Sequence, residues 1–165
     1  MPGPVVTLAD LTLRTQAHGD SFEAHMAAVA GPAGARRLGA RLVEVPAGKK
    51  GWPYHCHHAN DELFVILSGR GELRFGEAVH PFAAGDVLVC PAGGPETAHQ
   101  IIASGSEPVR YLAVSTMNDP DVMEYPDSGK LTVFAGAPPG GDSAARRVAI
   151  NVRAADAVNY WDGES

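Results

Sequence analysis

The chain has 165 residues, a formal net charge of −6 and a pI of about 5.6, with 45% hydrophobic and 19% charged residues. This composition is typical of one folded domain and excludes a disordered chain, and the acidic charge leaves no basic stripe for nucleic acid. No apolar run approaches the roughly 20 residues of a membrane span, and no basic stretch leads into an apolar one at the N-terminus, so we expect a cytoplasmic protein with neither nucleic-acid nor membrane partners.

The early part of the chain gives a weak structural pattern. Residues 22–29 fit either a short helix or an edge strand. From Leu38 onward, short apolar runs alternate with Gly and Pro, which is the spacing of an all-β sandwich or barrel. The expected strands cover residues 38–45, 54–58, 63–67, 72–75, 79–82, 87–90, 99–103 and 109–115. No amphipathic helix of 10 or more residues interrupts this stretch, which argues against βαβ units.

The whole chain, residues 1–165, is expected to be a single domain, because it contains no internal repeat of useful length. The barrel core would cover about residues 38–116. Residues 117–165 form a more polar C-terminal extension with one or two further strands, expected at 131–134 and 148–152. The two cysteines, Cys56 and Cys90, do not form a disulfide framework and are expected to be reduced, packed thiols.

The segment His55-Cys56-His57-His58-Ala59-Asn60-Asp61-Glu62 carries the clearest chemical signal. Side chains alternate between faces along a strand, so His55 and His57 point the same way, about 7 Å apart. Residues 58–61 suit a tight turn, and Glu62 can then return its carboxylate to the same point. Two imidazoles and a carboxylate at this spacing favour a metal ion.

A fourth ligand comes from farther along the chain. His99 follows the loop 91–98 and begins a new strand. Three imidazoles and one carboxylate suit a divalent transition metal, namely Mn, Fe, Co, Ni or Zn, and are a poor fit for Ca²⁺. With these four on one side of an octahedral ion, the remaining positions are open to water or substrate, as in a reactive centre.

A second register is compatible with the same segment. Cys56 and His58 also share a face and also precede Glu62 at a plausible distance. A shift of one residue exchanges the two faces of a strand, so only one of the two pairs can lie inside.

The barrel portion resembles the cupin superfamily over about residues 48–114. The first motif of that family is a His-x-His pair followed by Glu and Gly, and this chain matches it with His55, His57, Glu62 and Gly69. The second motif is matched by Gly85, Pro91, Gly93 and His99. Because the family motif needs two histidines, the resemblance selects the register with His55 and His57 inside.

Three features depart from the family pattern. The Gly that usually precedes the His pair is displaced to Gly48 or Gly51, the loop before His99 is three residues longer, and Ala103 stands in place of an Asn. These changes affect loop geometry more than ligand identity. The tail segments YPDSGK (125–130) and YWDGE (160–164) resemble those of small bacterial cupins that are often labelled after sugar-phosphate isomerases, a label that says little about substrate.

The resemblance implies an antiparallel double-stranded β-helix, or jelly-roll barrel, that binds a small molecule. Trp52 and Tyr54 would flank the metal near the entrance, and Ile66, Phe75 and Ile101 would line the interior; plain packing is the alternative for these five. The expected function is that of a metal-dependent enzyme acting on a small polar metabolite, as an isomerase, dioxygenase, decarboxylase or lyase. A non-catalytic binding or sensor protein is the alternative, and a structural barrel with an adventitious metal is a weaker one. Because cupins are commonly dimers, we expect a homodimer.

Overall fold

The computed structural model describes residues 3–164 and contains thirteen β-strands, short 3₁₀ turns and no α-helix over that range. All strand pairs in the sheets are antiparallel, so the expected fold class is confirmed. No helix in the described part of the chain is long and apolar enough to cross a membrane. The strands are β1 (Arg14–His18), β2 (Phe22–Ala28), β3 (Leu38–Val45), β4 (Cys56–His57), β5 (Glu62–Ser68), β6 (Arg70–Phe75), β7 (Ala78–Ala83), β8 (Val87–Cys90), β9 (His99–Ile102), β10 (Val109–Thr116), β11 (Asp121–Tyr125), β12 (Lys130–Ala135) and β13 (Val148–Arg153).

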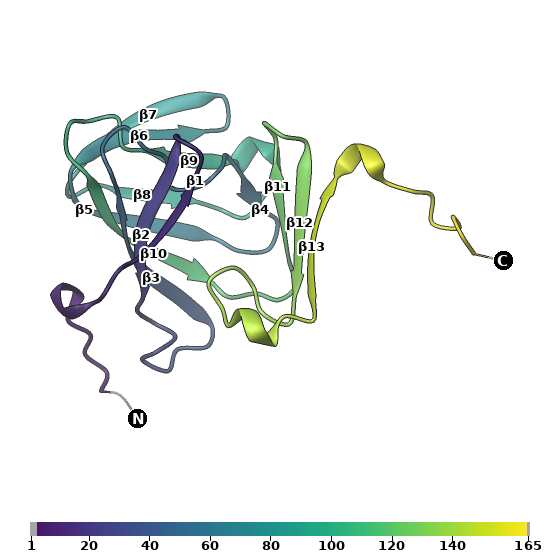
Figure 1. Cartoon of the computed structure of the whole chain (residues 1–165), viewed down its shortest axis with the longest axis horizontal. Coiled ribbons are helices and arrows are strands. Elements are labelled where there is room, and N and C mark those ends of the chain that lie inside the picture. Colours follow the sequence, from purple (N-terminus) through teal and green to yellow (C-terminus); the bar gives the residue numbers. More distant parts are fainter. Residues whose placement is uncertain (1–2, 165) are drawn as a thin grey trace.

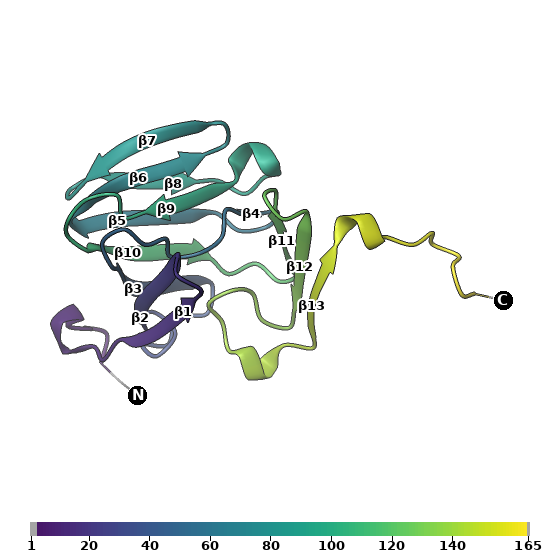
Figure 2. The same ribbon diagram turned by 45° about the horizontal axis from the view of Figure 1, so that its top comes forward.

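The barrel is built from a six-stranded sheet in the order β1-β2-β3-β10-β5-β8 and a three-stranded sheet in the order β7-β6-β9 (Figures 1 and 2). Both sheets contribute apolar side chains to one core. Its most completely buried members include Val43, Val45, Ile66, Val109 and Tyr111, each at most 2% exposed. This core supports the strands that carry the polar residues described below.

Two N-terminal strands extend the six-stranded sheet. Residues 22–28 form β2, which lies between β1 and β3 and is therefore an interior strand. β1 itself was not expected from the sequence, because all five of its residues are exposed and show no apolar alternation. The structure thus resolves the choice between helix and strand for this segment in favour of a strand.

The turn between β5 and β6 requires glycine. Gly69 has a φ of 83°, and a Cβ at this position would collide with the backbone carbonyl of Pro108. An L-residue would meet both the steric clash and the unfavourable left-handed backbone. This glycine therefore keeps β5 close to the start of β10, with which β5 pairs.

Strand β4 is shorter than expected, with only two residues, Cys56 and His57. His55 lies just before it and forms an isolated bridge with His99, the first residue of β9. On its other edge β4 pairs with β11. The short strand is therefore held between the barrel and the C-terminal sheet.

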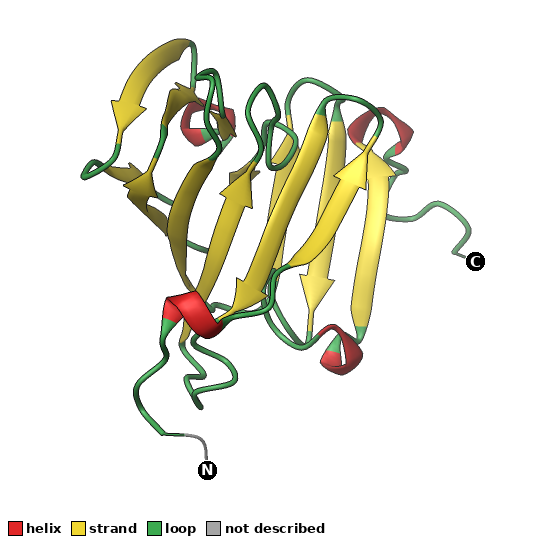
Figure 3. Cartoon of the chain, turned by 60° about the vertical axis from the view of Figure 1, so that its left-hand side comes forward, coloured by secondary structure: helices red, strands yellow, loops and turns green. Residues whose placement is uncertain are grey.

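The three strands of the C-terminal extension and β4 form a four-stranded sheet in the order β13-β12-β11-β4, labelled in Figure 1; the C-terminal arm leaves from this side of the molecule (Figure 3). β12 and β13 agree with the two expected strands, whereas β11 was missed because its sequence, DVMEY, places acidic residues among apolar ones. Beyond β13 the chain leaves the body of the molecule as an arm (Figure 1).

The outer edge of the C-terminal sheet generates a prediction about assembly. On the edge strand β13, Ile150 and Val152 are 48% and 43% exposed, and on the arm Tyr160 and Trp161 are 85% and 71% exposed. An exposed apolar edge strand is a template for pairing with another chain. We predict a two-fold dimer in which this edge and the arm pack on a second copy, with a mass in light scattering of twice the 17.2 kDa of one chain.

Matched variants test whether the dimer forms through the edge strand β13 or through the edge strand β7. Ile150→Lys places a charge on β13 and should shift the population toward monomer at micromolar concentration. Val79→Lys introduces the same charge on the exposed face of β7, where Val79 is 56% exposed, and should leave the dimer intact. A monomeric wild-type protein, or equal effects of the two substitutions, would contradict this arrangement.

Candidate metal centre

Four potential metal ligands come from three places in the barrel. His57 lies in β4 with His55 immediately before it, Glu62 is the first residue of β5, and His99 is the first residue of β9. The antiparallel bridge between His55 and His99 places the start of β4 beside the start of β9. The structure therefore brings together all four residues that the sequence pattern singled out, and we call them the inner site.

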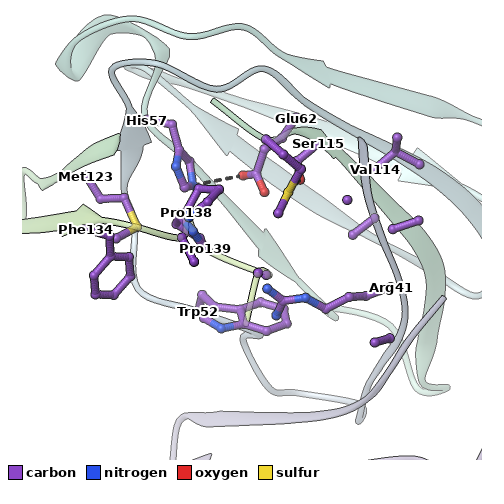
Figure 4. A pocket seen from close by; sticks show the side chains of 18 of the residues that line it. Arg41, Trp52, His57, Glu62, Val114, Ser115, Met123, Phe134, Pro138 and Pro139 are labelled. Carbon is purple, nitrogen blue, oxygen red and sulfur yellow. Dashed lines mark hydrogen bonds and ion pairs between the residues drawn. The ribbon is translucent and has the colours of Figure 1, made fainter. Parts of the chain in front are cut away.

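The side chains of the inner site meet around the Glu62 carboxylate. Oε2 of Glu62 lies 2.9 Å from Nε2 of His99 and 3.4 Å from Nε2 of His57. Single donor atoms of His55, Glu62 and His99 all lie within 4.8 Å of one another. Figure 4 shows His57 and Glu62 pointing toward each other across the cavity.

The far nitrogen of each imidazole has an acceptor of its own. Nδ1 of His57 lies 2.7 Å from Oδ2 of Asp121. Nδ1 of His55 lies 2.7 Å from the carbonyl oxygen of Pro53, and Nδ1 of His99 lies 3.3 Å from that of Thr97. When Nδ1 is used in this way, Nε2 is left as the coordinating atom, which is the arrangement that orients histidine ligands in metal proteins.

Asp121, the first residue of β11, was not singled out from the sequence. It is completely buried and also accepts a hydrogen bond from the backbone N–H of Ala59. A carboxylate 64 residues beyond His57 carries no spacing signal, and only the pairing of β11 with β4 brings it to the imidazole. This residue links the C-terminal sheet to the inner site.

Hydrogen bonds to neighbouring segments fix the turn between His57 and Glu62. Asn60 is 3% exposed; its Oδ1 accepts from the backbone N–H of Asn118 and from the hydroxyl of Thr116, and its Nδ2 donates to the carbonyl of Asn118. Asp61 accepts a hydrogen bond from the backbone N–H of Ala92. These bonds fix the chain direction at the point where Glu62 enters β5.

The ionisation of the inner site follows from its burial and its contacts. Burial opposes charge on His57, but its hydrogen bonds to Asp121 and Glu62 outweigh this and raise its pKa to about 9. Burial likewise opposes charge on Glu62, yet the hydrogen bonds from His57 and His99 keep its pKa well below the ordinary value. Burial and the neighbouring His99 lower the pKa of His55 to about 4. The Glu62 carboxylate therefore stays ionised and available to a cation.

The donor set fits a divalent transition metal. Three inward Nε2 atoms and one carboxylate match the nitrogen and oxygen preferences of Mn, Fe, Co, Ni and Zn. The protein groups behind the imidazoles complete the shell that such sites use to hold their ligands. The residues present could hold such an ion, and metal analysis of the purified protein would identify it.

A cavity of about 1350 Å³ opens in front of the inner site. Of the expected pocket residues, Trp52 and Ile101 line it. Tyr54, Ile66 and Phe75 lie outside its lining. Tyr54 precedes β4 and packs with Cys56 and Ala98, and its hydroxyl donates to the carbonyl of Gly76; Ile66 and Phe75 pack in the apolar core.

The C-terminal extension supplies a wall of the cavity that the sequence did not predict. Tyr125 of β11 stacks on the ring of His55, with centroids 5.7 Å apart. Pro138 and Pro139 face the cavity from the loop between β12 and β13 (Figure 4). Tyr125, the first residue of the YPDSGK segment, thus belongs to the site.

Comparison with known proteins agrees with this architecture. A family model described as a cupin domain matches residues 41–115. A curated relative, an uncharacterized protein of Methanocaldococcus jannaschii, is 30% identical over 84 residues. The matched segment is 48% of this chain and spans 64% of that protein, less than two thirds of its length.

Solved structures are similar over a longer part of the chain. A sugar phosphate isomerase of the cupin superfamily from Silicibacter pomeroyi superposes with a TM-score of 0.76 at 21% identity, over 96% of this chain and 98% of that one. A protein from Acidithiobacillus ferrooxidans, provisionally described as a sugar phosphate isomerase, gives 0.75 at 22% identity over 94% and 96%. A predicted oxalate decarboxylase from Thermotoga maritima gives 0.59 at 24% identity over 68% and 97%. At these identities the likeness concerns the fold alone.

Two single variants test which face of β4 holds an ion. His57→Ala removes an inward imidazole and should weaken Mn²⁺ binding by at least about tenfold, whereas His58→Ala on the outer face should leave it unchanged. Mn²⁺ suits this test because it prefers nitrogen and oxygen ligands over sulfur. Free Mn²⁺ can be counted from its electron paramagnetic resonance signal. Loss of binding in the His58 variant alone would mean that the strand faces the other way.

A second prediction concerns the metal-free protein. The pKa of His57 is raised from 6.5 to about 9, so the folded state holds this proton more tightly than the unfolded chain. The stability gained this way is complete below about pH 6.5 and is lost as the pH rises toward 9. We expect chelator-treated protein to lose stability on the order of 2 kcal/mol over that interval in urea unfolding.

The partner of His57 provides the control for this pH dependence. Asp121→Asn removes the charged acceptor of His57, so the loss of stability between pH 6.5 and 9 should become smaller in this variant. Asp127→Asn, on an exposed carboxylate that pairs with Arg74, should retain it. If the stability of the metal-free wild type does not change between pH 6.5 and 9, the role assigned to His57 is wrong.

Proposed function

We propose that this protein, whose residues 41–115 match a cupin-domain model, is a metal-dependent enzyme that acts on a small anionic metabolite in the cavity in front of the inner site. The observation that carries the proposal is the position of Arg41, which has no carboxylate partner among the described residues, in the same cavity as the four candidate metal ligands. A metal held by His55, His57, Glu62 and His99 would supply Lewis acidity toward an oxygen of the substrate.

Arg41 enters the cavity from β3. It is half-buried, and among the described residues no carboxylate lies within ion-pair distance of its guanidinium. Its only hydrogen-bond partner in that part of the chain is the sulfur of Met26, at 3.7 Å. Burial lowers the pKa of Arg41, an effect that Glu62 partly offsets. A half-buried guanidinium without an anion is a binding group for a carboxylate or a phosphate.

Apart from the exposed Arg36, the other charged groups that line the cavity are already engaged. Arg146 donates to the carbonyls of Ala137 and Pro138 and lies over the ring of Phe134. Glu62 contacts the histidines, Asp119 accepts from Gly136, and Asp142 caps the short turn at Ala144. The unsatisfied charge in the cavity is therefore positive, which favours an anionic ligand.

The position of Arg41 also suits a ligand that reaches the inner site. Figure 4 shows its guanidinium extending toward the middle of the cavity beside Trp52. A small molecule could place its anionic group on Arg41 and present a hydroxyl or carbonyl oxygen to the metal ligands. Trp52 and the two prolines of the opposite loop supply apolar walls that exclude water.

The names of the similar structures are compatible with this substrate class. Sugar phosphates and oxalate are both anionic oxygen ligands, and the proteins that carry those names share this fold. Isomerisation, oxygenation, decarboxylation and elimination all begin with such a ligand bound through oxygen. Turnover assays, with and without oxygen consumption, would distinguish them.

A non-catalytic binding role is the second candidate, and one observation favours it. The three carboxylates that line the cavity, Glu62, Asp119 and Asp142, all accept hydrogen bonds within the protein. Each is therefore already engaged in the fold, so no unpartnered carboxylate is offered as a general base among the described residues that line the cavity. Saturable binding without turnover of any bound compound would support a sensor or carrier.

A ligand panel tests the proposal on metal-loaded protein. Sugar phosphates and hydroxy acids are each paired with the neutral sugar or amide of similar size, and binding is read by thermal shift and calorimetry. We expect only anionic members to bind. Arg41→Gln should weaken their binding about tenfold or more, because a hydrogen bond to a charged group contributes roughly 1.5–3 kcal/mol.

Arg36→Gln serves as the matched control. Arg36 also lines the cavity but is exposed, so its replacement should have a small effect. Circular dichroism would verify that both variants keep the barrel. Equal binding of neutral and anionic compounds, or equal effects at both arginines, would overturn the assignment of an anionic substrate.

A further inference from the structure

The outer face of β4 carries a second group of potential metal ligands. Cys56 and His58 flank His57 in sequence and point away from the inner site, and Glu124 of β11 is the cross-strand partner of Cys56. One donor atom from each of these three residues lies within 4.8 Å of the others. We call Cys56, His58 and Glu124 the outer cluster.

The register of the two strands explains why these side chains meet. Cross-strand partners share a face of the sheet, so Glu124 lies on the same side as Cys56. His58 is two residues beyond Cys56 and follows the same alternation, and its backbone N–H donates to the carbonyl of Val122. The pairing of β4 with β11 therefore produces the convergence.

The distances are close to those that a small ion requires. Nε2 of His58 lies 3.2 Å from Oε2 of Glu124. Two nitrogen or oxygen ligands of a tetrahedral ion, at bond lengths near 2.0–2.2 Å, are themselves separated by about 3.4 Å. The thiol of Cys56 lies within 4.8 Å of donor atoms of both His58 and Glu124, and a change of side-chain rotamers can close the remaining gap.

One member of the outer cluster is buried, and the other two are partly exposed to solvent. Cys56 is completely buried beside Tyr54 and Ala98. The side chains of His58 and Glu124 are 42% and 32% exposed, so an ion can enter from solvent between them. Glu96 is close enough to act electrostatically on both Cys56 and His58, and it adds negative charge at the exposed side of the cluster.

We propose that the outer cluster is a second metal site, specific for a thiolate-preferring ion such as Zn²⁺, on the opposite face of the strand that carries the inner site. One sulfur, one nitrogen and a carboxylate suit tetrahedral Zn²⁺ or Co²⁺, with Glu96 or water as the fourth ligand. The inner site has no sulfur ligand, so the two sites differ in the ions they prefer.

An ion at the outer cluster would act as a clip between two parts of the fold. The sheet ladder between β4 and β11 is short and contains two residue pairs, His57 with Met123 and Cys56 with Glu124. The same strand β11 carries Asp121, which orients His57 in the inner site. Binding at the outer cluster would therefore hold the C-terminal sheet, and with it Asp121, against the barrel.

Cobalt titration of the full-length protein tests this site directly, because only a thiolate ligand gives sulfur-to-Co²⁺ charge-transfer absorption. We expect this band to appear in the wild type and to level off at the intensity of one thiolate-bound Co²⁺ per chain. It should be lost in Cys56→Ser and persist in Cys90→Ser, whose thiol is buried in the barrel core. His58→Ala and Glu124→Gln should weaken Co²⁺ binding at this site by about tenfold or more.

An inner-site variant distinguishes the two proposals. Glu62→Gln is close in shape to the native side chain and should impair the inner site while leaving the charge-transfer band unchanged. Absence of the band in the folded wild type, its survival in Cys56→Ser, or its loss in Glu62→Gln with the fold retained would each overturn the outer site. None of these outcomes depends on whether the cavity binds an anion.

Discussion

The orientation of the two-residue strand β4 is the constraint on which the rest of the site depends. β4 pairs with β11 on one edge, and the residue before it bridges to β9 on the other. With both edges held, the strand cannot shift by one residue without losing these bonds and exchanging its two faces. Four consecutive residues are thereby divided between an inner face with His55 and His57 and an outer face with Cys56 and His58.

The inner site is orientated by groups that do not themselves touch its centre. Backbone carbonyls hold two of the imidazoles, and the buried carboxylate of Asp121 holds the third. A buried carboxylate is costly unless it is paired, and Asp121 is paired with His57. The cost of burying that charge is offset only when β11 lies against β4, so the C-terminal sheet and the inner site form together.

The C-terminal extension therefore belongs to the candidate site. It contributes the ring that stacks on His55, the loop that faces Arg41 and the acceptor for His57. The family model ends at residue 115, whereas two solved structures superpose over more than nine tenths of this chain. Structures that resemble this protein from end to end therefore share the fold of the extension as well as that of the barrel.

The sequence by itself determined the all-β class, most strands of the barrel and the four residues of the inner site, because period-two alternation and Gly/Pro punctuation are local signals. It missed β1 and β11, whose residues show no apolar alternation, and it placed Tyr54, Ile66 and Phe75 at the cavity. Only the tertiary structure decided which face of each strand meets the cavity, and only it brought Asp121, Tyr125 and Arg41 to the site. Their contacts join residues far apart in the chain, and such pairings are set by how sheets pack together, which no local spacing records.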